Sequence, residues 1–319
     1  QFELCEGCSV HISKRPEGYF LEGKSVENGE IVESTKIWDA EKNEALAFTD
    51  EFESSDMFAS NPGMFNSLIQ RSSSYDLHIY YGYDNWAYDV IELLEAKSNK
   101  SLLELENLAR AHDLIACDYL HPGQMGDKPH GDKYEEVFYG TVESERIENF
   151  TIHADKSLSY YEEIIAADPD YQTHLIGSVQ LKYSNNCVNY YHNLMSVKQD
   201  ELAMDYLAKT NYPEPFLKMA RLILDECATN GFLFTNGDSD TFPLWYVQHK
   251  LNYREDVSVL NLSLMNSPAY LAMVIDRENL NTNLPLELIK DSKSTFVLLD
   301  QLSYDLSLIH ISEPTRQKP

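Results

Sequence analysis

The sequence predicts an α+β multi-domain protein: a small β-sandwich-like N-terminal module, an α-helical repeat-like middle and a short α/β (βαβ) C-terminal module. Three observations predict this class. Runs with a period of two open the chain, runs with the helical period fill its middle, and a strand–helix–strand order begins near residue 232. A length of 319 residues also exceeds that of most single domains, so we expect two or three units.

Residues 1–60 form the predicted β-rich module. Partly alternating runs such as GYFLEG and EIVESTKIW are separated by the turn signals ENGE and DAEKN. The stretch KIWDAEKNEALAFTD resembles the small β-sandwich of carboxypeptidase-regulatory type, and this resemblance implies the sandwich-like form. Cys5 and Cys8 have CxxC spacing, which leaves a metal or redox site, a local disulfide or two ordinary thiols as alternatives.

Residues 72–230 form the predicted helical domain. NWAYDVIELLEAK and SLLELENLARAHDLIACDYL carry apolar residues at helical spacing. Two further helices are expected at DELAMDYLAKT and EPFLKMARLILDECATNG, the second stopped by Asn230 and Gly231. The stretch ADKSLSYYEEIIAADPDY resembles the second half of a tetratricopeptide repeat, through Ser157, Tyr161, Ile164 and Pro169. This resemblance implies a scaffold of helical hairpins.

Residues 231–305 form the predicted α/β module. FLFT is expected to be a short buried strand, FPLWYVQHKLNY a helix with Pro243 near its first turn, and DVSVLNLSLM a second strand. This order is that of a βαβ unit, and SPAYLAMVID is expected to follow as a helix. We set residues 306–319 aside as a non-native tail, because LSLIHISEPTR resembles the translated sequencing adapter of a metagenomic read.

Composition argues against several classes of function. The net charge of −27 argues against binding to nucleic acid or to an anionic membrane surface. No run approaches the roughly 18 apolar residues of a membrane span. GxSxG, P-loop, GxGxxG and HExxH motifs do not occur. Because neither an initiator Met nor a signal peptide opens the chain, we interpret it as a mature protein or a fragment.

The candidate ligand site lies in the loop that follows FLFT. Ligands of open α/β sheets bind beyond the carboxyl ends of the strands, and polar residues follow both predicted strands there. The predicted ligand-binding residues are Asn236, Gly237, Asp238, Asp240, Thr241, Trp245, Asn261 and Ser263. Asp240 is expected to cap the next helix, whereas Asp238 is expected to face the ligand.

The two aspartates leave three interpretations open. They are turn and cap chemistry, a polar ligand site without metal, or a divalent-metal site at Asp238 and Asp240. No cofactor is otherwise implied. His112, His121 and His130 flank an Asp-rich loop, but their spacing fits no common zinc pattern. The tyrosines of YDLHIYYGYDNWAYD suit carbohydrate stacking or peptide contact, with packing in a helical hairpin as the alternative.

One longer block carries a family resemblance. LFTNGDSDTFPLWYVQHKLNYREDVSVLNLSLMN resembles a block of bacterial protein O-mannosyltransferase-like proteins, many of them multi-spanning membrane proteins of unknown function. The matching residues are Thr235 to Asp240, Thr241 to Tyr246, Arg254, Asp256 and Val259 to Leu264. In that family the block lies in a soluble region near tetratricopeptide-like helices. The resemblance therefore implies a soluble module and does not carry over the membrane-embedded transferase part.

These observations together predict a binding or assembly protein of the bacterial envelope or periplasm rather than the cytoplasm. Its α/β loop would recognise a protein partner or a glycan-like polar ligand. The alternative is a glycan-acting enzyme, or a subunit of one, that uses a divalent metal at Asp238 and Asp240, with a further catalytic group beyond Asp305.

Overall fold

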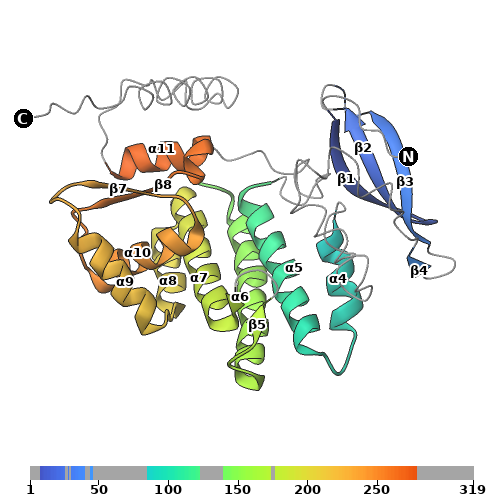
Figure 1. The fold of residues 1–319 in the computed structure, drawn as a ribbon, viewed down its shortest axis with the longest axis horizontal. Coiled ribbons are helices and arrows are strands. Elements are labelled where there is room, and N and C mark those ends of the chain that lie inside the picture. The colour runs from blue at the N-terminus through green and yellow to red at the C-terminus, as the bar shows by residue number, and fades with distance from the viewer. Residues whose placement is uncertain are drawn as a thin grey trace, which may run out of the picture. The chain divides into compact units, whose positions relative to one another are not determined.

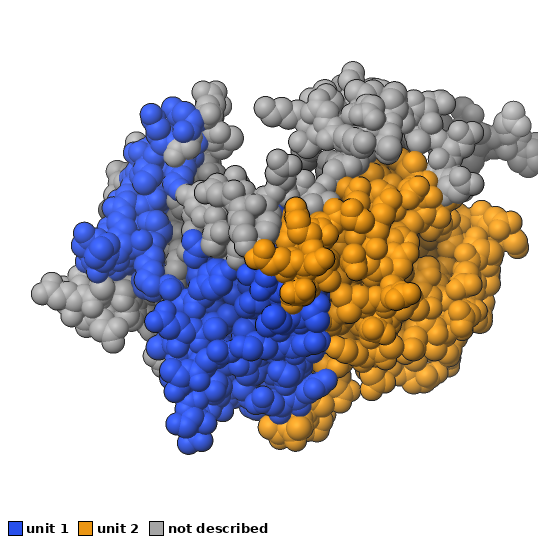
Figure 2. Space-filling view, turned by 180° about the vertical axis from the view of Figure 1, so that it is seen from behind, with its two compact units in different colours: residues 1–135, 149–164 blue, residues 136–148, 165–319 orange. Residues whose placement is uncertain are grey.

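The computed structural model describes residues 8–25, 28, 30–39, 44–45, 85–122, 139–173 and 177–278. The predicted mixed class is confirmed: an antiparallel sheet comes first, helices follow, and a short α/β region comes last (Figure 1). The chain divides into two compact units (Figure 2). Unit 1 comprises residues 1–135 and 149–164, and unit 2 comprises residues 136–148 and 165–319. Cys5, His130 and the tail 306–319 lie outside the described residues.

Unit 1 begins with an antiparallel sheet of order β1-β2-β3-β4. Its strands are β1 (Cys8–Arg15), β2 (Gly18–Ser25), β3 (Ile31–Asp39) and β4 (Glu44–Ala45). The first hairpin pairs Arg15 with Gly18, and Gly18 has a φ of 141°, which favours glycine. The described strands form one sheet here, whereas a sandwich requires two sheets that face each other.

Two helices of unit 1 form a hairpin, α4 (Trp86–Glu95) and α5 (Leu102–Leu120), both at the predicted positions. α5 begins at a capping box, in which Ser101 Oγ accepts from the Glu104 amide and the Glu104 carboxylate accepts from the Ser101 amide. Val90 and Leu94 of α4 lie in one buried apolar cluster with Leu108 of α5. The helical spacing of these apolar residues therefore builds the core of the hairpin.

The next helix, α6 (Ser144–Ala167), contains the stretch that resembles half a tetratricopeptide repeat. Ser157, Tyr161 and Ile164 are fully buried. Their burial agrees with one inward face of a helix. The repeat class itself remains a prediction.

Unit 2 is built around a central helix. Its elements are β5 (Gln172–Thr173), β6 (Gly177–Ser178), α7 (Val179–Ser196), α8 (Asp200–Lys209), α9 (Glu214–Asp225), β7 (Phe232–Thr235), α10 (Asp238–Leu251), β8 (Ser258–Asn261), the 3₁₀ helix η2 (Leu264–Asn266) and α11 (Pro268–Arg277). α10 contacts α7, α8, α9 and β8. Because it is surrounded, it buries residues on every side, and its sequence has no polar face.

The predicted βαβ unit is present, since β7 and β8 pair in parallel and α10 connects them. The predicted end of α9 and the predicted start of α10 were wrong. α9 ends at Asp225 rather than at Asn230, and α10 begins at Asp238, which makes Pro243 its sixth residue. The prediction that FLFT is buried was also wrong. Phe232 and Phe234, which lie on one face of β7, are 55% and 56% exposed.

None of the described helices combines the length and the apolar composition that crossing a bilayer requires.

Candidate functional site

A groove of about 420 Å³ lies beside the carboxyl end of β7, within unit 2. Its wall is mostly apolar and comes from α9, β7, α10 and the residue after β8. These residues are Phe216, Met219, Ala220, Ile223, Leu233, Phe234, Pro243, Leu244 and Leu262. Three of the polar residues that line it, Asn236, Ser239 and Asp240, come from the loop after β7 and the first turn of α10. The groove thus combines an apolar wall with a polar rim at the place that the sequence predicts.

The rim is rich in hydrogen-bond acceptors. Asp240 is exposed and contributes a carboxylate. Pro243 has no N–H, so the carbonyl of Ser239, four residues earlier, lacks the donor that an α-helix normally supplies. Asn236 is exposed and accepts a hydrogen bond from the Ser263 hydroxyl at its Oδ1, 3.0 Å away. A ligand that donates hydrogen bonds or carries positive charge would therefore match this rim.

A buried hydrogen-bond network positions the loop. The Thr241 hydroxyl lies 2.8 Å from the Gly237 carbonyl, to which it donates, and 2.7 Å from the Thr235 hydroxyl. It also accepts from Asn261 Nδ2 at 2.8 Å. Asn261 Oδ1 in turn accepts from the Leu264 amide at 3.0 Å. Thr241 and Asn261, both predicted to bind ligand, are therefore used to hold β7, α10 and β8 together, and neither lines the groove.

The start of α10 differs from the prediction at the two aspartates. The N-cap of α10 is Gly237, which makes no side-chain cap bond, so the prediction that Asp240 caps the helix was wrong. Both aspartates lie in the first turn, where residues two apart point to nearly opposite sides. Asp240 lines the groove. Desolvation raises the pKa of Asp238, and the charge of Lys182 on α7 partly opposes that rise.

The spacing of Asp238 and Asp240 on α10 affects whether they could bind the same divalent ion. A cation held by both aspartates would need their oxygens to converge on one point, and the helical geometry separates them. In the part of the chain that the structure describes, no group of three or more His, Cys, Asp or Glu side chains is arranged to hold a metal. The helical spacing therefore favours separate roles for Asp238 and Asp240 over one shared ion.

Trp245 was predicted to belong to the same site, but it lies elsewhere on α10. Its Nε1 donates to the Val259 carbonyl at 3.2 Å, and its ring lines a second cavity of unit 2. Gly237 contributes the N-cap and its carbonyl, and Ser263 fastens the loop through Asn236. Of the predicted residues, the structure thus brings Asn236 and Asp240 to the rim of the groove.

Exposed apolar side chains on the elements that line the groove were missed by sequence reasoning. Large apolar side chains between 37% and 59% exposed belong to α9, to β7 and to the residue after β8: Met219, Leu222, Ile223, Phe232, Phe234 and Leu262. The run MARLIL in α9 could have shown this, because it holds more apolar residues than one buried helix face needs.

In unit 1, His112 pairs with a residue that the sequence did not suggest. Its Nδ1 lies 2.8 Å from Nδ1 of His153, and its Nε2 lies 3.3 Å from Oε1 of Glu95. The His112 side chain is 1% exposed, and desolvation lowers its pKa to about 4. His121, which follows His112 in the sequence, occupies the C-cap position of α5.

Comparison with known proteins gives one match. Residues 216–297 match the model of a family described as TMEM260-associated domain 2. No curated protein and no solved structure matches the chain. The matched range runs from the third residue of α9 through β7, α10 and β8, and it includes every residue that lines the groove.

Proposed function

We propose that this chain is a binding or assembly module of the bacterial envelope, whose groove receives a segment of a protein partner. The observation that carries the proposal is the groove itself: an apolar wall and an acceptor-rich rim, with exposed apolar side chains on the elements that line it. The segment would insert an apolar side chain between α9 and β7. It would also place an adjacent basic side chain beside Asp240.

These exposed apolar side chains favour a protein over a small polar ligand. Apolar surface with a polar edge is typical of protein interaction sites, and a small polar ligand would leave most of these side chains uncovered. The net charge of −27 and the Asp240 carboxylate favour a segment with positive charge, through electrostatic complementarity.

The family match also supports a protein partner. Its description names a domain associated with TMEM260, and the block that resembles bacterial protein O-mannosyltransferase-like proteins lies inside the matched range. We therefore include in the proposal that the partner is a membrane protein of this kind, or a second region of the same polypeptide. The proposal does not include a glycan-acting enzyme with a metal at Asp238 and Asp240, because residues two apart in a helical turn point to nearly opposite sides.

Two peptides test the proposal. Both carry the same central Leu-Phe pair, and they differ only in flanking Lys or Glu residues. Methyl NMR spectra of the full chain are recorded, with resonances assigned for Met219 and Ile223. We expect the Lys-flanked peptide to shift both signals and the Glu-flanked peptide to bind at least several-fold more weakly.

Two matched variants test the contribution of the Asp240 charge to peptide binding. Asp240→Asn removes one negative charge in the groove, and Asp205→Asn removes one on the exposed surface of α8. Only Asp240→Asn should weaken binding of the Lys-flanked peptide. Equal binding of the two peptides, equal effects of the two variants, or unchanged Met219 and Ile223 signals would contradict the proposal.

A further inference from the structure

Strand β7 has an edge whose backbone groups are unpaired in the part of the chain that the structure describes. β7 and β8 pair in parallel as a two-stranded sheet. The carbonyls of Gly231 and Thr235 accept from amides in β8 and just after it, at 2.9 and 2.7 Å. Because the backbone groups of a strand alternate in direction, those of Phe232 and Phe234 point away from β8. Their N–H and C=O groups form no hydrogen bond with a described residue, so this edge of β7 is open.

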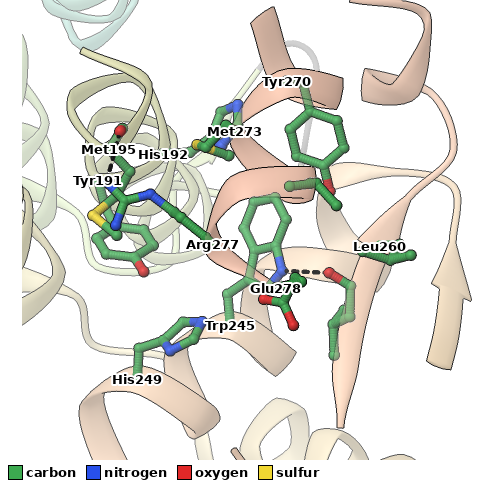
Figure 3. A pocket seen from close by; sticks show the side chains of 12 residues that line it. Tyr191, His192, Met195, Trp245, His249, Leu260, Tyr270, Met273, Arg277 and Glu278 are labelled. Atoms are coloured by element: carbon green, nitrogen blue, oxygen red, sulfur yellow. Dashed lines mark hydrogen bonds between the residues drawn. The ribbon is translucent and has the colours of Figure 1, made fainter. Parts of the chain in front are cut away.

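The outer edge of β8, by contrast, is occupied by side chains. Trp245 Nε1 donates to the Val259 carbonyl at 3.2 Å, and Figure 3 shows this bond. The Asn261 amide donates to the Tyr270 hydroxyl at 2.9 Å. A further strand could join at β8 only by displacing these side chains. The sheet can therefore be extended at β7 and not at β8.

The surroundings of the open edge suit apolar side chains on both faces of an added strand. The Thr235 hydroxyl lies 2.7 Å from a hydroxyl of α10, so this face of β7 is turned toward the helices. Thr235 also lines the groove, whose wall includes Met219 and Ile223 of α9, and these are 59% and 37% exposed. Phe232 and Phe234 are exposed on the other face. Successive side chains of an added strand would therefore meet the groove and these phenylalanines in turn.

Charge distinguishes between the possible occupants of this edge. A second copy, paired edge to edge through β7, would bring together two chains that each carry a net charge of −27. Asp240 lines the groove from the first turn of α10, and no Lys or Arg occurs among the described residues that line it. A partner segment with Lys or Arg beside its apolar residues has the complementary charge. Charge therefore favours such a segment over a second copy.

We propose that the partner segment binds as an extended strand, which pairs with the open edge of β7 and adds a third strand to the sheet. This inference rests on the proposed function, because it specifies how the segment in the groove is held. The N–H and C=O groups of Phe232 and Phe234 exchange hydrogen bonds with alternate residues of the segment. Its apolar side chains on one face enter the groove, and its flanking Lys or Arg lies beside Asp240.

Two N-methylated peptides test the strand geometry in calorimetric titrations of the full chain. In the Lys-flanked peptide, the backbone amide of either the central Leu or the central Phe is methylated, which removes one donor and keeps the side chain. Because a paired strand uses alternate amides on one side, one peptide should bind about threefold to tenfold more weakly than its parent. The other should bind within about twofold of the parent. Equal weakening by both methyl groups, or none by either, would refute the added strand.

Two variants of Phe232 test whether the pairing occurs on β7. Phe232 is 55% exposed and is not among the residues that line the groove. Phe232→Pro removes the N–H that points away from β8, and an edge strand tolerates proline at such a position. Phe232→Ala removes the ring and keeps the N–H. Phe232→Pro should bind the Lys-flanked peptide about threefold to tenfold more weakly than Phe232→Ala, and equal affinities would overturn the proposal. If Phe232→Pro does not fold, the two methylated peptides decide.

Hydrogen exchange of the full chain distinguishes the occupants. The amides of Phe232 and Phe234 should exchange quickly without peptide and about tenfold or more slowly with the Lys-flanked peptide. Protection without peptide would overturn the proposal: it would indicate a second copy if it increases with chain concentration, and another part of the same chain if it does not. If the peptide shifts the methyl signals of Met219 and Ile223 but neither amide gains protection, the added strand is refuted and the proposed function stands. If those methyl signals do not shift, the proposed function fails and the added strand with it.

Discussion

Acidification should destabilise unit 1 through His112. The side chain is 1% exposed, and its imidazole faces His153 and Lys156 of α6 and Glu95 of α4, while Tyr160 stacks on it at 5.8 Å. Desolvation is the main cause that lowers its pKa from 6.5 to about 4, and the charges of His153 and Lys156 add to it. In the folded chain the imidazole therefore stays neutral well below pH 6.5.

The sign and the size of this change in the free energy of unfolding follow from proton linkage. Between pH 6.5 and 4 the unfolded chain binds a proton at His112 that the folded chain does not bind. The stabilising contribution is thus complete above pH 6.5 and is lost as the pH falls through this window. From pH 7 to pH 5 the free energy of unfolding should decrease by about 2 kcal/mol on account of this residue.

Urea unfolding at the two pH values measures this loss. Trp86 packs against the buried cluster of α4 and α5, so its fluorescence reports on unit 1 when Trp38 and Trp245 are replaced by phenylalanine. His112→Gln in the same background cannot titrate, and its free energy of unfolding should fall by about 2 kcal/mol less than that of the parent. Identical pH dependence in the two proteins would refute the reasoning.

Four further outcomes are expected. Ser101→Ala should cost about 0.5–2 kcal/mol in urea unfolding because it breaks the capping box of α5, and Ser101→Thr should retain most of the stability. Thr241→Val should lower the free energy of unfolding by about 1–3 kcal/mol, because it leaves the Gly237 carbonyl and Asn261 Nδ2 without their buried hydrogen-bond partner. Thr241→Ser should retain these hydrogen bonds, and a Val variant as stable as the parent would contradict the network. The melting temperature, followed by scanning fluorimetry, should rise with salt at a net charge of −27, and a flat response up to about 1 M would contradict this. Chelator should leave the melting temperature unchanged, and a clear decrease would return the divalent metal to consideration.

Local signals predicted the helices of the hairpin well. The start of α5 follows from Ser101 and Glu104, because a capping box involves only neighbours along the chain. The start of α10 could not be found in this way, since Pro243 and Asp240 both suggested a later beginning. The buried contact between Thr241 and Asn261, 20 residues apart, holds the first turn of α10 against β8, and a contact of that range has no local signature.

The groove was predicted only in part, for a related reason. Polar residues after a parallel strand pointed to this end of β7, where Asn236 and Asp240 line the groove. Met219 and Ile223 were not foreseen, because an apolar residue on a helix is usually assigned to a core. The burial of Asn261 could not be predicted either. An asparagine at the end of a strand can bind a ligand or a neighbouring side chain such as Thr241, and the sequence alone does not distinguish the two.

The path of α6 has a practical consequence for dividing this protein. One continuous helix contributes residues 149–164 to unit 1, while its first and last residues belong to unit 2. The chain therefore passes between the units at residues 135–136, 148–149 and 164–165, and no single cleavage point releases either of them intact. Truncations intended to isolate the groove or the histidine pair would sever a helix and expose its buried face. Circular permutants or paired co-expression of fragments would suit this chain better than a simple deletion series.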